Sequence, residues 1–178
     1  MRGRKVLNCF CYTGGFSVSA AMGGAVSVTS VDSSRPALET AARNMELNGF
    51  SGEAFTLVNA DVPSCLRRMR DEGVRFDAVI LDPPRYVANR DALQRGARAY
   101  KDINMLAMSL LEPGGLLFTF SCSGLMGEEL FQKVVFSASA DSGRNMRIVG
   151  RLAQAPDHPV LLSYPQAGYL KGLILQGK

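Results

Sequence analysis

The sequence has little of what builds metal centres, disulfide frameworks or membrane spans. Its 178 residues include one histidine and four cysteines, and their spacing matches no zinc-binding pattern, so we expect no metal site. No apolar run reaches the roughly 18 residues that a membrane-spanning helix needs, and we see no basic-then-apolar export signal. We therefore expect free thiols, a reducing cytoplasmic location and no membrane partner.

The residues that are present are typical of a globular domain with its own core. Hydrophobic residues make up 47% of the chain and charged residues 20%, which is ordinary for such proteins. A chain of 178 residues can fold as one domain, and no linker, repeat or low-complexity tract divides it. We expect one domain over residues 1–178. The formal net charge of +4 mildly favours an anionic partner.

Apolar runs of strand length alternate with helical patterns along the chain. Residues 35–49 have apolar positions at helical spacing and close on Gly49, and residues 92–115 predict a second helix that Pro113 and the glycines after it end. This alternation predicts an α/β fold with an open, doubly wound, mainly parallel sheet that is covered on both faces. The predicted strands span residues 5–10, 25–32, 54–61, 76–82, 115–122, 146–154 and 169–176.

The end of the first strand predicts a nucleoside cofactor, because ligands of such sheets bind beyond the carboxyl ends of the strands. In the loop NCFCYTGGFS (8–17), Gly14 and Gly15 would let the backbone approach a ligand at a helix start. Asp32 ends the second strand, where an acid commonly accepts hydrogen bonds from ribose hydroxyls. The loop lacks the G-x-G-x-x-G of dinucleotide sites, which favours S-adenosylmethionine. A simple turn, and a helix cap at Asp32, remain the alternatives.

Three later strands also end in residues that can carry chemistry. Asp61 closes the third strand and could accept a hydrogen bond from an adenine amino group, or cap the helix that Pro63 begins. The fourth strand ends in LDPPRY (81–86), where two prolines fix a rigid exposed loop just past Asp82. Cys122 ends the fifth strand. In the usual doubly wound order the fourth and fifth strands are neighbours, about 4.8 Å apart. We therefore expect Asp82 and Cys122 to face the same ligand.

With these residues assembled, the chain resembles the class I S-adenosylmethionine-dependent methyltransferases. More narrowly, it is similar to the RlmI family, which makes 5-methylcytosine in 23S ribosomal RNA. The resemblance covers essentially the whole chain and rests on NCFCYTGGFSVSA, VDSS, ALETAARNMELNG, LDPPRY, TFSCSGLM, DHPVLLSYP and YLKGL. Many methyltransferases share the cofactor loop and the DPP motif, whereas TFSCSG together with DHPV and YLKGL is specific.

The resemblance implies a Rossmann-like seven-stranded sheet in the order 3-2-1-4-5-7-6, with strand 7 antiparallel. It implies S-adenosylmethionine as the cofactor and 23S ribosomal RNA as the partner. It also implies that Asp82 lies beside the target base and that Cys122 is the catalytic nucleophile. The cofactor-binding residues that it implies are Asn8, Cys9, Phe10, Tyr12, Thr13, Gly14, Gly15, Asp32, Ser33 and Asp61.

Two features depart from the family pattern. Members normally begin with a PUA domain and a β-hairpin that help hold RNA, whereas this chain starts at MRGRK, so we expect a fragment. DPPRY also lacks the second cysteine that another group of RNA cytosine methyltransferases has there, which leaves the base for the C5 proton unassigned. The remaining RNA contacts would come from Arg85, Arg90, Arg95 and Arg98, although a solvated helix face explains these arginines equally well.

Methylation at C5 explains why a thiol would be needed. Carbon 5 of cytosine is a poor nucleophile, and addition of a thiolate at C6 makes it reactive. One alternative function is methyl transfer to N2 of guanine or N6 of adenine. Such enzymes typically have an aromatic residue directly after the two prolines, where this chain has Arg85 before Tyr86. The other alternative is a non-catalytic module that binds RNA or cofactor, which would not need Asp82 and Cys122 together.

Overall fold

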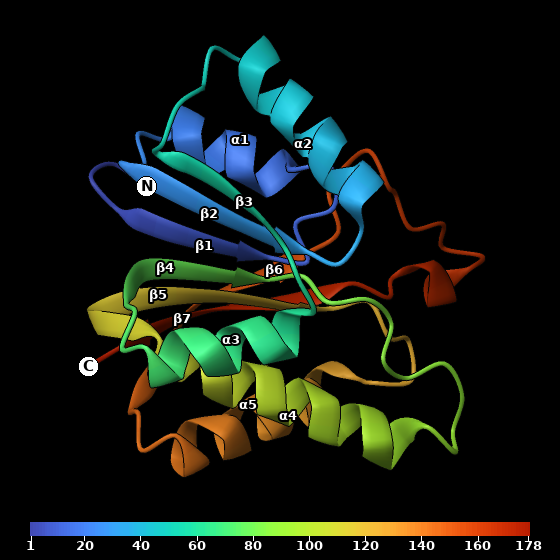
Figure 1. The fold of residues 1–178 in the computed structure, drawn as a ribbon. Helices are drawn as coiled ribbons and strands as arrows, with labels where there is room; N and C mark the ends of the chain where they lie inside the picture. Colours follow the sequence, from blue (N-terminus) through green and yellow to red (C-terminus); the bar gives the residue numbers. More distant parts are fainter.

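A computed structural model describes all residues, 1–178, and contains a single seven-stranded sheet, drawn in Figure 1. The strand order is β3-β2-β1-β4-β5-β7-β6, and only β7 runs antiparallel to its neighbours, β5 and β6. This confirms the expected doubly wound α/β fold. The strands are β1 (Lys5–Cys9), β2 (Ser27–Asp32), β3 (Phe55–Asn59), β4 (Phe76–Leu81), β5 (Leu111–Ser121), β6 (Met146–Ala153) and β7 (Lys171–Gly177).

The chain has five α-helices, which cover the sheet in two layers (Figure 1). Helices α1 and α2 lie on one face, and α3, α4 and α5 lie on the other. Their bounds are α1 (Gly15–Met22), α2 (Arg35–Leu47), α3 (Val62–Asp71), α4 (Leu93–Ser109) and α5 (Glu128–Asp141). None of these helices is both long and apolar enough to cross a membrane.

The central strands are apolar on both sides, which is why they lie between two helical layers. In β4, Val79 joins the larger core cluster, which includes residues of α3, α4 and α5, while Ile80 joins the smaller cluster, which includes residues of α1. The neighbouring strand β1 divides Leu7 and Val6 between the same two clusters. Successive side chains of a strand point to opposite faces, so a continuous apolar run fills both layers.

The second predicted helix ends earlier than the sequence indicates. Helix α4 stops at Ser109, and the chain enters β5 at Leu111, which pairs with Phe76 of β4. The expectation of a helix up to residue 115 is therefore wrong. The residue before a proline is disfavoured in helical geometry, so Pro113 already acts on Glu112 and favours the extended conformation there.

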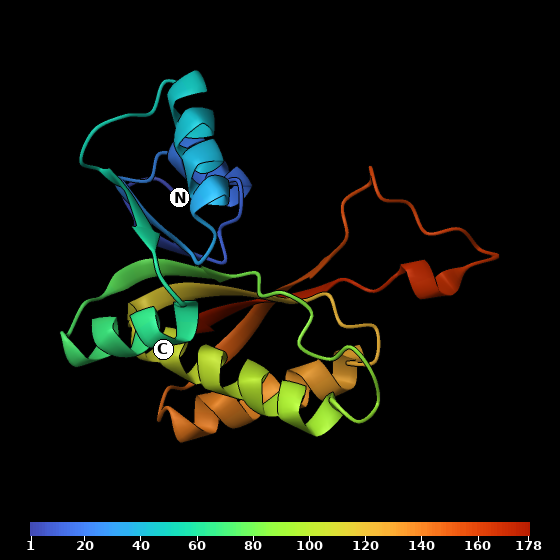
Figure 2. The same cartoon turned by 45° about the vertical axis from the view of Figure 1, so that its right-hand side comes forward.

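The connection between β6 and β7 projects beyond the sheet (Figure 2). It spans residues 154–170 and contains a short 3₁₀ helix, η1 (Pro165–Ala167). The loop between β4 and α4, residues 82–92, lies at the same end of the molecule (Figure 1), and below it is called the DPP loop. The carboxyl ends of the parallel strands also lie at this end of the molecule, which is where such sheets bind ligands.

Candidate active site

The loop between β1 and α1 has a strained backbone. Phe10 and Tyr12 both have positive φ, 59° and 49°, and such a conformation is uncommon for residues other than glycine. Two backbone hydrogen bonds hold it, from Cys11 N to Val31 O at 3.1 Å and from Gly14 N to Cys11 O at 2.8 Å. The loop is therefore built mainly by its backbone and is held against β2.

Gly14 and Gly15 meet different surroundings. Gly14 has a φ of 82°, and a Cβ atom there would lie 2.9 Å from the Cβ of Ala41 on α2, so only glycine fits. A Cβ at Gly15 would meet nothing within 4 Å, which leaves open space at the start of α1. No side chain caps α1, so its first N–H groups can donate to a ligand.

Asp32 organises the loop at the end of β2. Its Oδ2 accepts a hydrogen bond from Tyr12 N and its Oδ1 accepts one from Ser34 N, both at 2.9 Å. Ser34, and not Asp32, is the N-cap of α2. Each carboxylate oxygen has a second lone pair, and the half-buried Asp32 can still accept from a ligand.

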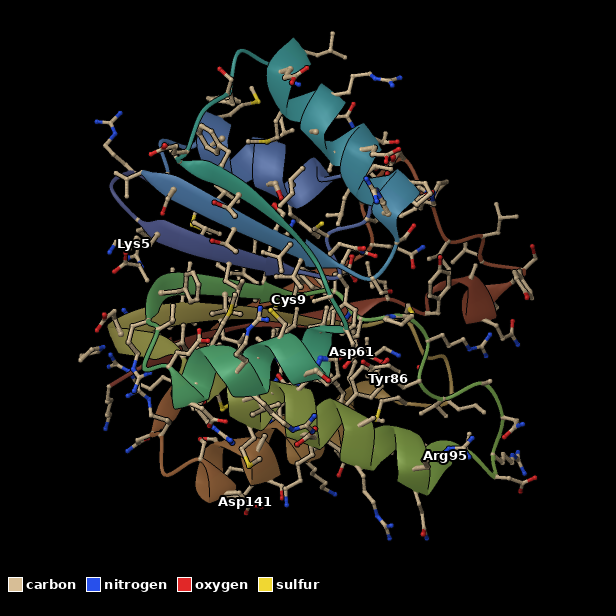
Figure 3. The ribbon with its side chains drawn as sticks, viewed as in Figure 1. Lys5, Cys9, Asp61, Tyr86, Arg95 and Asp141 are labelled. Atoms are coloured by element: carbon tan, nitrogen blue, oxygen red, sulfur yellow. The ribbon has the colours of Figure 1, made fainter.

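Asp61 is the N-cap of α3. Its Oδ2 accepts hydrogen bonds from Ser64 N at 3.0 Å and from Ser64 Oγ at 2.7 Å. These bonds, together with the charge of Arg67, hold the pKa of the carboxyl below its usual value. Figure 3 shows Asp61 and Tyr86 at the same end of the sheet, whereas Lys5 lies at the other end.

Four other residues of the implied cofactor site differ in exposure. The side chains of Asn8 and Cys9 are fully buried in β1, and Asn8 Nδ2 donates to Ser17 Oγ at 2.8 Å. Only their backbone is therefore available at the strand end. Thr13 is half-buried, and its carbonyl accepts from Asn44 Nδ2 at 2.8 Å, while Ser33 is exposed next to Asp32.

Asp82 begins the DPP loop in a half-buried position. Burial raises the pKa of its carboxyl, and no hydrogen bond to the carboxylate compensates that burial. The next aromatic residue, Tyr86, is packed inwards against Phe10 and Tyr100, with ring centroids 6.5 and 5.0 Å apart. Burial also raises the pKa of Tyr86 to about 12, so its hydroxyl stays protonated.

Cys122 differs from the other three cysteines, which are all buried. It is half-buried at the end of β5, and its Sγ lies 3.9 Å from the carbonyl oxygen of Pro83 in the DPP loop. Burial raises the pKa of the thiol and so does the charge of Asp82, whereas its own backbone N–H, Arg85 and Lys171 lower that pKa. The structure thus brings Cys122 into contact with the DPP loop.

The thiol lines a cavity of about 680 Å³ between the DPP loop and the β6–β7 connection. Tyr164 and Tyr169 supply aromatic surface there, and Arg85 supplies positive charge. Local sequence patterns give neither tyrosine a role in the site. Both lie in segments that carry the family resemblance, but their position opposite Cys122 depends on a connection that only the folded chain shows. The residues that line the cavity are Arg85, Cys122, Gly124, Leu125, Tyr164, Gln166, Gly168 and Tyr169.

Comparison with known proteins decides the family. A family model described as S-adenosylmethionine-dependent methyltransferase matches residues 1–176. The chain belongs to this family. The match and the loop geometry agree, because the open space at Gly15, the uncapped start of α1 and the carboxylate of Asp32 suit a nucleoside with an amino-acid tail.

Individual methyltransferases are similar over almost the whole chain. Ribosomal RNA large subunit methyltransferase I of Erwinia tasmaniensis is 54% identical over 171 residues, and that of Klebsiella pneumoniae is 53% identical over 169 residues. These matches cover 96% and 95% of this chain but only 43% and 42% of those proteins. The chain thus spans less than half the length of these curated relatives.

A solved methyltransferase structure shares the fold. SMU.776, crystallised in complex with SAH, superimposes with a TM-score of 0.86 at 25% sequence identity. The superposition covers 98% of this chain and 45% of that one. S-adenosylmethionine is accordingly the cofactor of this methyltransferase domain.

Proposed function

We propose that this chain is the catalytic domain of an enzyme that methylates C5 of a cytosine in 23S ribosomal RNA, with Cys122 as a covalent nucleophile. The observation that carries the proposal is the placement of Cys122, the one cysteine that is not buried, in the lining of a cavity beside the DPP loop. The rRNA large subunit methyltransferases that resemble the chain support the substrate class.

Cys122 would begin the reaction. Its thiolate adds to C6 of cytosine, so that a carbon–sulfur bond forms and the C5–C6 double bond is lost. The electron pair moves through C5 and C4 towards N3, which takes up a proton. Bound S-adenosylmethionine supplies an electrophilic methyl group for C5. The methyl donor would leave as S-adenosylhomocysteine, a base outside the residues named here would accept the C5 proton, and expulsion of the thiolate would then restore the aromatic ring.

Asp82 is the group that we assign to the N3 edge of the base. Burial raises the pKa of this carboxyl, so it takes up a proton more readily than an exposed aspartate does, and once protonated it can donate to N3 as the thiolate attacks. The carboxylate that remains can take the proton back when the ring is restored. C5 becomes nucleophilic only while the cytosine is held against both the Cys122 thiolate and the Asp82 carboxyl. The proposal therefore requires Asp82 and Cys122 to act on the same base.

The cavity suits a base that has left its stack. Tyr164 and Tyr169 offer aromatic faces on which a flipped base can stack, as base-modifying enzymes require. Four exposed arginines near the DPP loop take part in no ion pair and can contact phosphates. They are Arg85, Arg90, Arg95 and Arg98, and Figure 3 labels Arg95 at this end of the molecule.

The packing of Tyr86 weighs against the amino-group alternative. Enzymes of that type stack an aromatic residue of this loop on the base, whereas Tyr86 is packed between Phe10 and Tyr100. A non-catalytic module, the other alternative, would have no use for a thiol beside a half-buried carboxyl. Both observations favour the cytosine-C5 reaction.

The test is an adduct-trapping experiment. An enzyme containing this domain is incubated with S-adenosylmethionine and 23S rRNA fragments that carry 5-fluorocytosine. Because fluorine cannot leave C5 as a proton does, the covalent complex should accumulate, and mass spectrometry should map it to Cys122. The matched control is Cys122→Ser, which should form no adduct under the same conditions.

Two outcomes would contradict the proposal. One is an adduct on Cys9, Cys11 or Cys65, which would remove Cys122 from the covalent step. The other is methylation without any adduct and with the methyl group on an exocyclic amine, as nuclease digestion and mass mapping of the RNA would reveal. The latter result would favour the amino-group alternative.

A further inference from the structure

Lys171 is the only charged side chain among the buried residues of the protein. It begins β7, directly opposite Ser121 on β5, and is 8% exposed. No carboxylate forms an ion pair with it. Burial of an ammonium group without a counter-ion is costly, so its place next to the end of β5 calls for a reason.

The ammonium is held by the turn that follows Cys122. Its Nζ donates hydrogen bonds to Ser123 O at 2.7 Å and to Met126 O at 2.6 Å. Met126 N donates to Ser123 O at 3.0 Å, which closes a turn over residues 123–126; these residues and Cys122, which precedes them, are here called the Cys122 turn. Lys171 is therefore bound to both ends of this closed turn.

The other contacts of the Cys122 turn link it to the DPP loop and to α4. Ser123 Oγ accepts a hydrogen bond from Val87 N at 3.2 Å and lies 3.1 Å from the hydroxyl oxygen of Tyr100. A Cβ atom at the next residue, Gly124, would meet nothing within 4 Å, so the turn is fixed on its inner side and open on its outer side. This arrangement presents the thiol to the cavity.

Three charged groups act on the Cys122 thiol. Asp82 of the DPP loop raises its pKa, whereas Arg85 of the same loop and Lys171 of β7 lower it. Arg85 is exposed, so salt screens its charge, but the ammonium of Lys171 lies behind the turn and away from solvent. Burial lowers the pKa of Lys171, and the charges of Cys122 and of Glu128 on α5 raise it.

We infer that Lys171 is a positioning residue for Cys122: its ammonium holds the Cys122 turn and supplies a fixed positive charge that favours the thiolate. The inference rests on the proposed function only in treating the thiol as a nucleophile. The inference explains why a charged side chain is buried at position 171, because a neutral side chain could fill the same space but could not stabilise a thiolate.

Alkylation of Cys122 tests this inference without RNA. The rate of iodoacetamide labelling is followed from pH 6 to 11, with the labelled peptide identified by mass spectrometry. The midpoint of the rate profile reports the thiol pKa, and its plateau reports access to the thiol. In Lys171→Met the midpoint should rise by about 1 pH unit, since the buried positive charge near the thiol is lost. Lys171→Arg should restore most of that shift.

A charge of equal sign elsewhere provides the matched control. Lys133→Met removes a surface lysine whose ion pair with Glu129 is exposed, and it should leave the midpoint unchanged. A folded Lys171→Met protein with the wild-type midpoint would overturn the inference. A changed plateau with an unchanged midpoint would likewise overturn it, because the lysine would then act through structure alone.

A second measurement leaves Lys171 intact and covers the case in which its variants do not fold. The side-chain resonance of Lys171 next to the ammonium is titrated by NMR in the wild-type chain and in Cys122→Ser. Because coupling between two sites is reciprocal, loss of the thiolate should lower the Lys171 pKa by the same amount. An identical Lys171 titration in both proteins would refute the coupling. Neither measurement depends on methyl transfer, so a failed RNA adduct with intact coupling would count against the proposed function alone.

Discussion

The two ends of the candidate site are built differently. At the β1–β3 end, the carboxylates of Asp32 and Asp61 each accept two hydrogen bonds from the chain itself. At the β4–β5 end, Asp82 is half-buried without such bonds, and the Cys122 thiol has one long contact with Pro83 O at 3.9 Å. The same sheet thus carries a satisfied polar region and an unsatisfied one.

Under the proposed function, this difference would separate cofactor binding from chemistry within one fold. Bonds that close the cofactor loop also stabilise the folded state, so the loop is formed before a ligand arrives. Asp82 and Lys171 instead contribute an unfavourable free energy of burial, which is common where side chains must react. Substitutions at the β1–β3 end should therefore reduce stability or cofactor binding. Substitutions of Asp82 or Cys122 at the β4–β5 end should reduce activity and leave stability unchanged or higher.

The largest effect should come from Cys122→Ala. Because no other residue could replace the proposed covalent step, we expect kcat/KM for RNA methylation to fall by roughly 1,000-fold or more, with cofactor affinity and folding retained. The matched variant Cys65→Ala removes a buried thiol on α3 and should keep its activity, with a loss of about 1 kcal/mol in unfolding free energy. Equal activity of the two variants would end the distinction between the two regions.

The next largest effect should be the loss of stability in Gly14→Ala. The new side chain would require both a left-handed backbone and space that Ala41 occupies, so we expect about 2–4 kcal/mol of destabilisation in denaturant unfolding. Gly49→Ala has nearly the same φ, 81°, but open surroundings, and should cost only about 1 kcal/mol. Similar values for both would show that the contact between the loop and α2 is loose.

Asp32→Ala should weaken cofactor binding by about 1.5–3 kcal/mol, as calorimetry with S-adenosylmethionine can measure. The variant removes an acceptor for the ligand and also the bonds that hold Tyr12 N and Ser34 N. Asp157→Ala, which changes an exposed carboxylate paired only with His158, is the control and should bind normally. An unchanged affinity in folded Asp32→Ala would remove Asp32 from the site.

The smallest effects should separate Asp61 from Asp82. Asp61→Ala removes a helix cap and should destabilise the protein by about 1 kcal/mol at neutral pH. The folded pKa of Asp61 is lowered, so its stabilisation is present above the unfolded value of about 3.9 and is lost as the pH falls through the folded pKa. Thermal unfolding of wild type and variant should therefore converge in acid.

Asp82→Asn should act in the opposite direction. The folded pKa of Asp82 is raised, so its carboxyl contributes most to the stability of the folded state below the unfolded pKa of about 3.9. That contribution is lost as the pH rises through the folded pKa. The amide variant avoids a buried charge and should gain roughly 0.5 kcal/mol at neutral pH while it loses activity. A destabilised Asp82→Asn would mean that the carboxylate has structural partners after all.

Much of the fold follows from local patterns. All seven strands lie where apolar runs predict them, within a few residues, because a strand buried on both faces needs a continuous apolar sequence. Periodicity predicts a helix over residues 35–49, and α2 ends two residues earlier, at Leu47. Helix α5, Glu128–Asp141, was not predicted, since its exposed Phe136 blurs the apolar stripe. The position of Cys122 beside the DPP loop also followed from the sequence, because the ends of adjacent parallel strands must meet.

The sequence by itself determined which residues lie at the strand ends, since turn chemistry and strand length are local properties. Tertiary structure alone decided which groups surround them. The antiparallel pairing of β7 with β5 places Lys171 opposite Ser121, and the β6–β7 connection places Tyr164 and Tyr169 at the Cys122 cavity. These residues lie more than 40 positions after Cys122 in the chain. No local pattern encodes such contacts, because they form only when distant segments share one sheet and one end of it.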